Sequence, residues 1–247
     1  MSPQPSLNTF CQNCGKPETV SSHLIPKAFA LEARGEDKHL ETFGKKIGKS
    51  QSGVWDNNLL CYSCDAHLGK LDKYAIEVCR DLISLGSVKA TFALLKQVDG
   101  RVIAKFANSI FWRCAMSRRP ELASYSLPKE RQESMRTALF GADSESYGLM
   151  PVVAMRYVFT HVSPNGFFTF PYSHSVSGVD WHIFILGGFR FMAAPFREKL
   201  PRHFLTINHK RKMPVHLVDF RETTEAQHMV RMVQQHSVAH EQLASEA

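Results

Sequence analysis

The sequence predicts an α+β protein with a cysteine-rich N-terminal module, a helical middle and a β-rich final part. Three observations lead to this prediction. Two Cys-x-x-Cys pairs lie within the first 64 residues. Apolar residues then recur at three- and four-residue steps, which is the period of amphipathic helices. After Gly141, apolar and β-branched runs alternate with turn signals. We place the three regions at residues 1–75, 76–140 and 141–247.

The N-terminal module is expected to contain a short strand, a helix and a long connection. Pro26 suits the first turn of a helix but not its interior, so the helix should cover residues 27–33. Four glycines and four lysines between residues 34 and 54 predict a long basic loop or an open hairpin.

A helix is expected to begin at Leu68, where apolar residues take up a helical period that continues to Leu85, so this helix joins the module to the helical middle. Asp65 has the side chain of a good N-cap and could begin this helix. Gly86 and Ser87 would end it. Further helices are expected over residues 88–98, 102–116 and 128–140.

The final part is expected to be mostly strands. Ser163-Pro164-Asn165-Gly166 is a strong turn signal, and Gly187-Gly188 predicts a second hairpin. A polar terminal helix is expected over residues 223–244. The expected strands cover residues 149–162, 167–172, 179–186, 189–192 and 215–218.

The cysteines favour a metal over disulfides. Zinc prefers four thiolates in a tetrahedral shell, and each Cys-x-x-Cys turn places two sulfurs on one side of an ion. The two pairs, Cys11 with Cys14 and Cys61 with Cys64, could therefore close one structural zinc site around the intervening loop. The two remaining cysteines lie among apolar neighbours and are interpreted as core residues; they are Cys79 and Cys114.

Composition excludes wholesale disorder and a membrane span. The chain of 247 residues is 44% hydrophobic and 21% charged, and no apolar run approaches the roughly 20 residues that cross a bilayer. No signal peptide is visible at the N-terminus, so we expect a cytoplasmic protein without a membrane partner. The net charge of +7 weakly favours a polyanionic partner. Only +1 of it falls within residues 1–75.

Several motifs of the module, in the same order, resemble the HNH endonucleases. These motifs are the first cysteine pair with Gly15 and Lys16, the run Ser22-His23-Leu24-Ile25-Pro26, and the run Leu59-Leu60-Cys61-Tyr62-Ser63-Cys64-Asp65. The resemblance implies a zinc-stapled ββα-metal fold over about residues 11–75. It also implies hydrolysis of phosphodiester bonds with a catalytic Mg²⁺ or Mn²⁺ ion.

Carried over residue by residue, the resemblance makes His23 the general base that takes a proton from water. The family usually has Asp before this histidine and His or Asn after the last cysteine, whereas this chain has Ser22 and Asp65. The family's middle Asn falls on Asp56 without a gap, or on Asn57 or Asn58 after a local deletion. A further possible ligand for the catalytic ion is His67.

The departures suggest a compensation. Serine is a poorer ligand for a hard cation than carboxylate, and Asp56 together with Asp65 could replace the carboxylate lost at Ser22. Lys45, Lys46 and Lys49 would then follow a nucleic-acid backbone. Further candidate phosphate contacts outside the module are Lys210, Arg211, Lys212, and Arg113, Arg118 and Arg119 near Trp112.

The resemblance thus predicts an endonuclease acting on DNA. Similar bacterial proteins suggest a place in phage defence or in a mobile element. The alternative is a catalytically inactive HNH-like zinc module that serves as a nucleic-acid-binding or protein-binding adaptor in a larger complex, and Ser22 is the residue that favours it.

Overall fold

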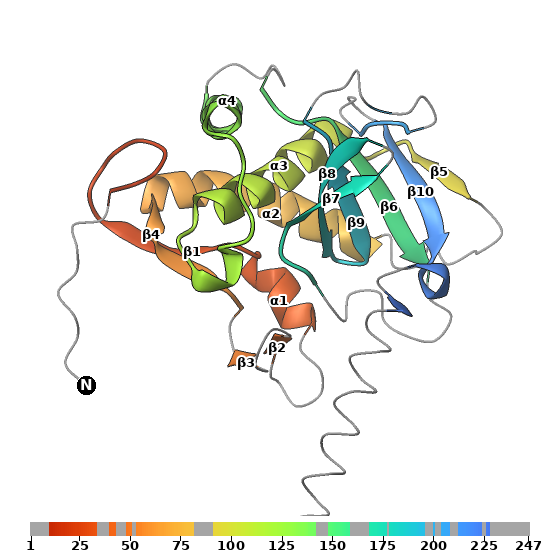
Figure 1. Ribbon diagram of the computed structural model, residues 1–247, viewed down its shortest axis with the longest axis horizontal. Coiled ribbons are helices and arrows are strands. Elements are labelled where there is room, and N and C mark those ends of the chain that lie inside the picture. The colour runs from red at the N-terminus through yellow and green to blue at the C-terminus, as the bar shows by residue number, and fades with distance from the viewer. Residues whose placement is uncertain are drawn as a thin grey trace, which may run out of the picture.

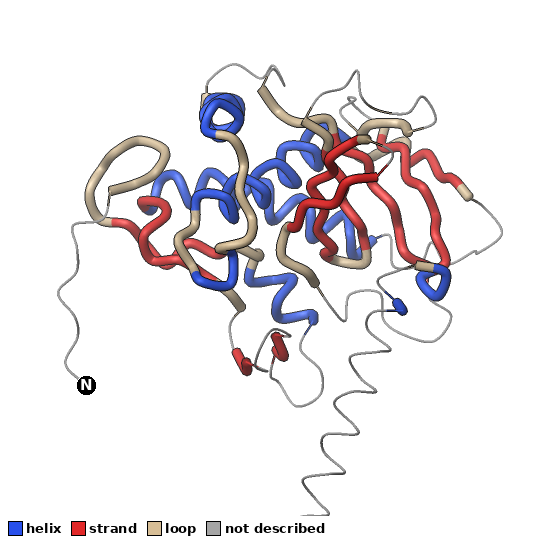
Figure 2. Tube along the Cα trace, viewed as in Figure 1, coloured by secondary structure: helices blue, strands red, loops and turns tan. Residues whose placement is uncertain are grey.

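The computed structural model describes residues 10–33, 40–42, 48–50, 53–81, 91–141, 148–158, 168–176, 178–195, 200, 204–207, 212–223 and 226–227. These residues form a mixed α+β fold with four α-helices and a six-stranded sheet (Figure 1). Helices and the smaller strand pairs gather on one side of the molecule, and the large sheet lies on the other (Figure 2).

The N-terminal part is built on an antiparallel strand pair followed by a long helix. Strand β1 covers Thr19–His23, strand β4 covers Trp55–Cys61, and helix α2 covers Tyr62–Asp81 directly after β4. The connection between the two strands carries helix α1 at Lys27–Ala33. It also carries an antiparallel pair, β2 at Leu40–Thr42 and β3 at Gly48–Ser50. The helix expected after Pro26 and the open hairpin are both confirmed.

Two further helices precede the main strands of the large sheet. Helix α3 covers Gly100–Met116, and Asp99 caps it by accepting a hydrogen bond from the Arg101 amide. Helix α4 covers Lys129–Phe140. The predictions of helices over 102–116 and 128–140 are therefore confirmed to within two residues.

The large sheet has the strand order β5-β10-β6-β9-β8-β7. Neighbouring strands are antiparallel except β10 and β6, which run parallel with His216 opposite Met155. The strands are β5 Phe92–Leu95, β6 Val152–Val158, β7 Tyr172–Val176, β8 Val179–Leu186, β9 Phe189–Ala193 and β10 Met213–Asp219.

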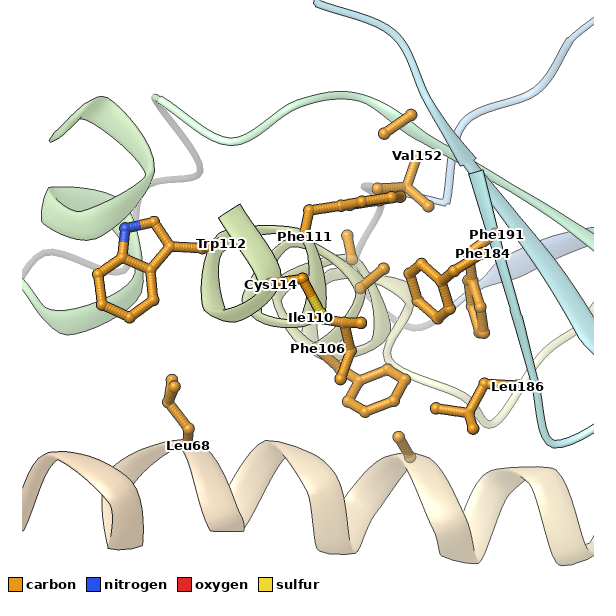
Figure 3. Packing of buried hydrophobic residues seen from close by; sticks show 14 of the residues in the cluster. Leu68, Phe106, Ile110, Phe111, Trp112, Cys114, Val152, Phe184, Leu186 and Phe191 are labelled. Carbon is orange, nitrogen blue, oxygen red and sulfur yellow. The ribbon is translucent and has the colours of Figure 1, made fainter. Parts of the chain in front are cut away.

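Helix α3 lies between α2 and the sheet. Leu68 of α2 faces it from one side, while Phe184 of β8 and Phe191 of β9 face it from the other (Figure 3). The Phe111 ring of α3 lies 4.9 Å from the Phe184 ring, centroid to centroid. A helix enclosed in this way must be apolar on most of its circumference, and α3 is the most deeply buried of the four helices described.

One continuous hydrophobic cluster joins the three regions that the sequence suggests. It runs from Cys11 beside the cysteine pairs, through α2 and α3, to Val215 on β10. A smaller cluster around Trp181 covers the opposite face of the sheet. The cysteine-rich part therefore shares its core with the rest of the chain, and the division at residues 75 and 140 stays a prediction.

Three expectations about the elements are wrong. Helix α2 begins at Tyr62, so Asp65 lies within its first turn and does not cap it. Residues 92–95 form the edge strand β5 and not part of a helix, because pairing with β10 overrides the local helical pattern. Residues 168–171 are not in a strand; the strand begins at Tyr172 and pairs with β8.

Some of the remaining predictions of strands, turns and buried residues are confirmed, and others fall outside the described residues. The Gly187-Gly188 turn joins β8 to β9 as the sequence predicts, and β10 includes the expected strand over 215–218. Cys79 and Cys114 are buried in the core as expected. The turn at 163–166 and most of the expected terminal helix lie outside the described residues.

Gly187 offers a direct test of how tightly the β8–β9 turn packs on the helices. Its φ is +59°, and a Cβ there would lie 2.6 Å from the Phe29 ring and 3.0 Å from the Cys79 Sγ. We expect Gly187→Ala to lower the free energy of unfolding by about 3 kcal/mol, because left-handed backbone costs about 1–2 kcal/mol and overpacking about 1–3 kcal/mol. Urea unfolding of the variant and the wild type measures this change in free energy.

Gly178 is the matched control for this substitution. Its φ is +75°, but a Cβ there would meet no atom within 4 Å. Gly178→Ala should therefore cost only the backbone term of about 1–2 kcal/mol. Equal losses in the two variants would show that contact with Phe29 and Cys79 does not constrain the turn.

Candidate functional site

Strands β1 and β4 and helix α2 form a β-β-α arrangement at the N-terminal end of the molecule (Figure 1). Ser22 pairs with Asp56 and His23 with Trp55, whereas Val20 pairs with Leu60. Strand β4 therefore has extra residues, and a bulge forms between these pairs. Bulges of this kind redirect side chains next to functional sites.

The four paired cysteines come together at one end of the β-β-α unit. Their Sγ atoms all lie within 4.8 Å of one another, and Cys14 Sγ is 3.7 Å from both Cys61 Sγ and Cys64 Sγ. A tetrahedral zinc ion with Zn–S bonds of about 2.3 Å requires sulfurs about 3.8 Å apart. The cluster could therefore hold a zinc ion with little rearrangement.

Local hydrogen bonds shape the turn of the first cysteine pair. The Cys11 amide donates to the Lys16 carbonyl at 2.8 Å, and the Gly15 amide donates to the Cys11 carbonyl at 2.9 Å. The Gln12 amide donates to the Leu59 carbonyl at 2.9 Å, which fixes the turn against β4. The second pair needs no such turn, because Cys61 ends β4 and Cys64 lies in the first turn of α2.

The two thiols of the second pair differ in acidity. Burial raises the pKa of Cys64 to about 12. Burial also acts to raise the pKa of Cys61, but hydrogen bonds from the Ser63 hydroxyl and the Cys64 amide outweigh it and lower that pKa to about 6. The cluster thus combines a thiol whose ionised form is favoured with one whose ionised form is disfavoured, and a bound metal would displace the proton of the latter.

His23 lies at the end of β1, beside the first turn of α2. Its ring is half-buried and tilted against the Trp55 ring, with centroids 6.3 Å apart. Burial raises the pKa of the neighbouring Asp65 carboxyl, and the Ser22 hydroxyl and the charges of Arg113 and His23 oppose that rise. The structure therefore brings Ser22, His23 and Asp65 to one place, as the resemblance implies.

Ser22 stands where the HNH pattern has aspartate. It is fully buried, and its Oγ makes no hydrogen bond of ordinary geometry among the described residues. It lies close enough to Asp65 to favour the ionised carboxylate. Asp65 is thus a carboxylate of the β-β-α unit that lies beside Ser22 and interacts electrostatically with His23.

The Asp56 carboxylate is buried and held by hydrogen bonds within the protein. It is buried, its Oδ1 accepts from the Asn58 amide at 2.8 Å, and its Oδ2 accepts from the Ser117 hydroxyl at 2.6 Å. Asn57 is exposed, and its Oδ1 accepts from the Ser21 hydroxyl at 2.6 Å. Both Asp56 oxygens are thus engaged in holding the bulge, and Asn57 and Asn58 are the exposed members of this group.

His67 contacts the C-terminal end of α4. Its Nε2 lies 2.9 Å from the Leu139 carbonyl oxygen, and its ring packs near Phe140 at the end of α4. His67 therefore connects α2 to α4 and is not grouped with Asp65 and His23.

The predicted basic contacts are described only in part. Lys49 lies in β3, and Lys212 is exposed just before β10. Lys45, Lys46, Lys210 and Arg211 lie outside the described residues. Arg118 is exposed at the end of α3, and Arg119 donates to the Trp55 carbonyl at 2.7 Å.

No family model, curated protein or solved structure matches this chain. The site must therefore be interpreted from its own geometry. Among the described residues, the four cysteines form the one group of three or more His, Cys, Asp or Glu side chains close enough to hold a metal. None of the helices described has both the length and the apolar character to cross a membrane.

Arg113 and Asp72 are the residues of this site whose role the sequence does not reveal. The sequence suggests Arg113 as a phosphate contact, but Arg113 is 1% exposed and pairs with Asp72, so this expectation is wrong. Asp72 follows Asp65 by seven residues, which places both on one face of α2. That spacing is the signal that could have indicated Asp72.

The cysteine cluster leads to a test of metal content. We expect purified protein to hold one zinc per chain, and Cys61→Ser to lose it, because removing one thiolate opens the tetrahedral shell. Elemental analysis measures the ratio. Cys114→Ala is the matched control, since Cys114 is buried outside the cluster, and it should keep one zinc. Retention of zinc by Cys61→Ser would overturn the assignment.

Zinc affinity should also depend on pH. With its pKa raised to about 12, the Cys64 thiol is protonated at neutral pH and must release its proton when zinc binds. Affinity should therefore rise with pH, by about tenfold per unit from this thiol alone. Competition with a chromophoric chelator between pH 6.5 and 8 measures the slope, and a flat profile would contradict the expected proton release.

Proposed function

We propose that this protein is a metal-dependent endonuclease of the HNH type that hydrolyses phosphodiester bonds, with DNA as the preferred substrate. The observation that carries the proposal is the meeting of His23 and Asp65 within a β-β-α unit that the four cysteines close at one end. The order of these motifs along the chain and their arrangement in space agree with the same family resemblance.

His23 acts as the general base. It extends from the end of β1 with its ring half-buried, so the ring is positioned by packing against Trp55 and retains access to water. It accepts a proton from the water that attacks phosphorus. Its neighbour Asp65 favours the positive charge that the ring gains in this step.

Asp65 is the described carboxylate beside His23 that could hold a catalytic ion. Mg²⁺ is commonly held by one or two carboxylates together with water and substrate phosphates, so Asp65 alone is compatible with an ion that binds together with the nucleic acid. Such an ion, Mg²⁺ or Mn²⁺, neutralises charge on the scissile phosphate when bound. The exposed Asn58 side chain is available for the substrate.

A second candidate function has its own support. Ser22 removes the aspartate that usually precedes the histidine, and the described residues show no cluster of three ligands other than the cysteines. These two observations favour a catalytically inactive HNH-like zinc module that binds nucleic acid or a protein partner as an adaptor. Phage defence or a mobile element is a context that the resemblance suggests for either function.

Plasmid nicking tests the proposal. We expect wild-type protein with Mg²⁺ or Mn²⁺ to nick supercoiled DNA, and His23→Ala to lower the rate by about 10²–10⁴-fold, as loss of a general base does. The matched control is His67→Ala, which removes a histidine of the same unit that contacts α4 and not the site. It should keep the wild-type rate.

Two outcomes of this assay would count against the assignment. Cleavage that survives His23→Ala would mean that His23 is not the base. No cleavage by wild-type protein, together with DNA binding that Mg²⁺ does not affect, would favour the adaptor.

Asp65 and Asp56 are expected to behave differently on substitution. Asp65→Asn should raise the Mg²⁺ concentration for half-maximal cleavage by at least the roughly 10–100-fold that loss of an outer-shell partner costs. Asp56→Asn should instead lower the free energy of unfolding by about 1–2 kcal/mol, because Asp56 holds Ser117 and the bulge. Metal titrations and urea unfolding of both variants measure this, and full activity in both would contradict a catalytic carboxylate.

A further inference from the structure

Arg113 of α3 reaches the candidate site from outside the β-β-α unit. Its Nη1 donates to the His23 carbonyl oxygen at 2.9 Å and to Asp72 Oδ2 at 3.0 Å. Its Nη2 donates to Asp72 Oδ1 at 2.7 Å and to Ser109 Oγ at 3.1 Å. Its Nε donates to the Ser109 carbonyl oxygen at 3.3 Å.

These contacts occupy the whole guanidinium. Arginine has five N–H donors, and each of the hydrogen bonds of Arg113 can use a separate one. The side chain is 2% exposed, so neither substrate nor water reaches it. Arg113 therefore acts through the protein groups it holds and does not contact a phosphate.

The groups that Arg113 joins belong to three elements. His23 ends β1, Asp72 lies in the middle of α2, and Ser109 lies one turn before Arg113 in α3. A backbone carbonyl bonded to a fixed guanidinium cannot shift along the strand without breaking a charge-assisted hydrogen bond. Because His23 is the last residue of β1, this bond fixes the point at which the side chain leaves the strand.

Arg113 also affects the ionisation of the Asp65 carboxyl. Its positive charge favours the ionised form of Asp65, whereas the negative charge of Asp72 opposes it. Asp72 is 16% exposed in its side chain, so it and Arg113 form a nearly buried pair. The His23 backbone and the Asp65 carboxylate thus respond to the same guanidinium.

We propose that Arg113, held by Asp72, is the positioning residue of the His23 site, and that α3 is part of the functional unit. This inference rests on the proposed function for its effect on cleavage. It extends the unit beyond residues 11–75, over which the resemblance runs.

The test replaces the ion pair by apolar side chains. Arg113→Met combined with Asp72→Leu removes the bond to His23 without leaving an unpaired buried charge, and such replacements commonly fold. The matched control is Arg80→Met with Glu32→Leu, which removes another ion pair between helices, at 2.5 Å, that does not contact His23. Zinc content and urea unfolding check that both double variants are folded.

The first measurement is the NMR signal of the His23 ring. In ¹³C-histidine-labelled protein, the His23 cross-peak is assigned by its loss in His23→Ala, and its contact with Trp55 is followed by the nuclear Overhauser effect. We expect the Arg113/Asp72 double variant to shift this cross-peak and weaken the contact, and the control to leave both unchanged. A wild-type His23 signal in the folded Arg113/Asp72 double variant would overturn the proposal.

The second measurement is plasmid nicking. We expect kcat of the Arg113/Asp72 double variant to fall by about 10–100-fold with less than a twofold change in KM, because displacement of a catalytic group by about 1 Å can cost 10²-fold. An unchanged kcat would also overturn the proposal. If wild-type protein does not cleave, the proposed function fails, while the His23 signal still tests the positioning role.

A conservative variant covers failure of the double variant to fold. Arg113→Lys keeps the charge but has one nitrogen, which cannot reach Asp72, Ser109 and the His23 carbonyl in the same planar geometry. We expect it to fold and to shift the His23 signal. A wild-type signal in Arg113→Lys would show that charge alone suffices and would overturn the positioning role of the guanidinium.

Discussion

The burial of helix α3 between α2 and the six-stranded sheet is the constraint on which the rest of the structure depends. One of its faces meets Phe184 and Phe191, and the other meets α2, so the helix has almost no solvent-facing side (Figure 3). A polar group on such a helix must have a partner, because an unpaired buried donor or acceptor is costly. Asn108 and Arg113 accordingly join α3 to other parts of the chain, whereas Ser109 forms hydrogen bonds within the helix.

These polar side chains connect α3 to both ends of the molecule. Asn108 donates to the Met150 carbonyl and accepts from the Met150 amide, which aligns the start of β6. Arg113 bonds Asp72 and the His23 carbonyl at the candidate site. Ser117, just after the helix, holds Asp56 at the bulge of β4. The large sheet and the β-β-α unit are thus aligned by one helix, and this explains why the hydrophobic core continues between them.

The cysteine cluster holds the other side of the β-β-α unit. Asn13, between the first two cysteines, donates to Cys64 Sγ at 3.2 Å and accepts from Arg136 of α4 at 3.1 Å. The cluster is therefore connected to the helical part by α4, much as His23 is by α3. A zinc ion there would fix the start of α2, and with it Asp65, relative to β1. Helices α3 and α4, outside the module, thus both contribute to holding the site.

From the sequence alone, one could predict the grouping of the four cysteines and the position of His23 just before the helix that follows Pro26. The helices, strands and turns whose residues have a strong local preference could be predicted as well. Spacing sufficed for these because ligand type, proline geometry and a Gly-Gly turn act over a few residues. Only the tertiary structure decided that 92–95 is an edge strand, that Asp56 is structural, and that Arg113 is a buried partner of Asp72. The physical reason is that each outcome depends on a partner distant in the chain, β10, Ser117 or Asp72, whose position no local pattern specifies.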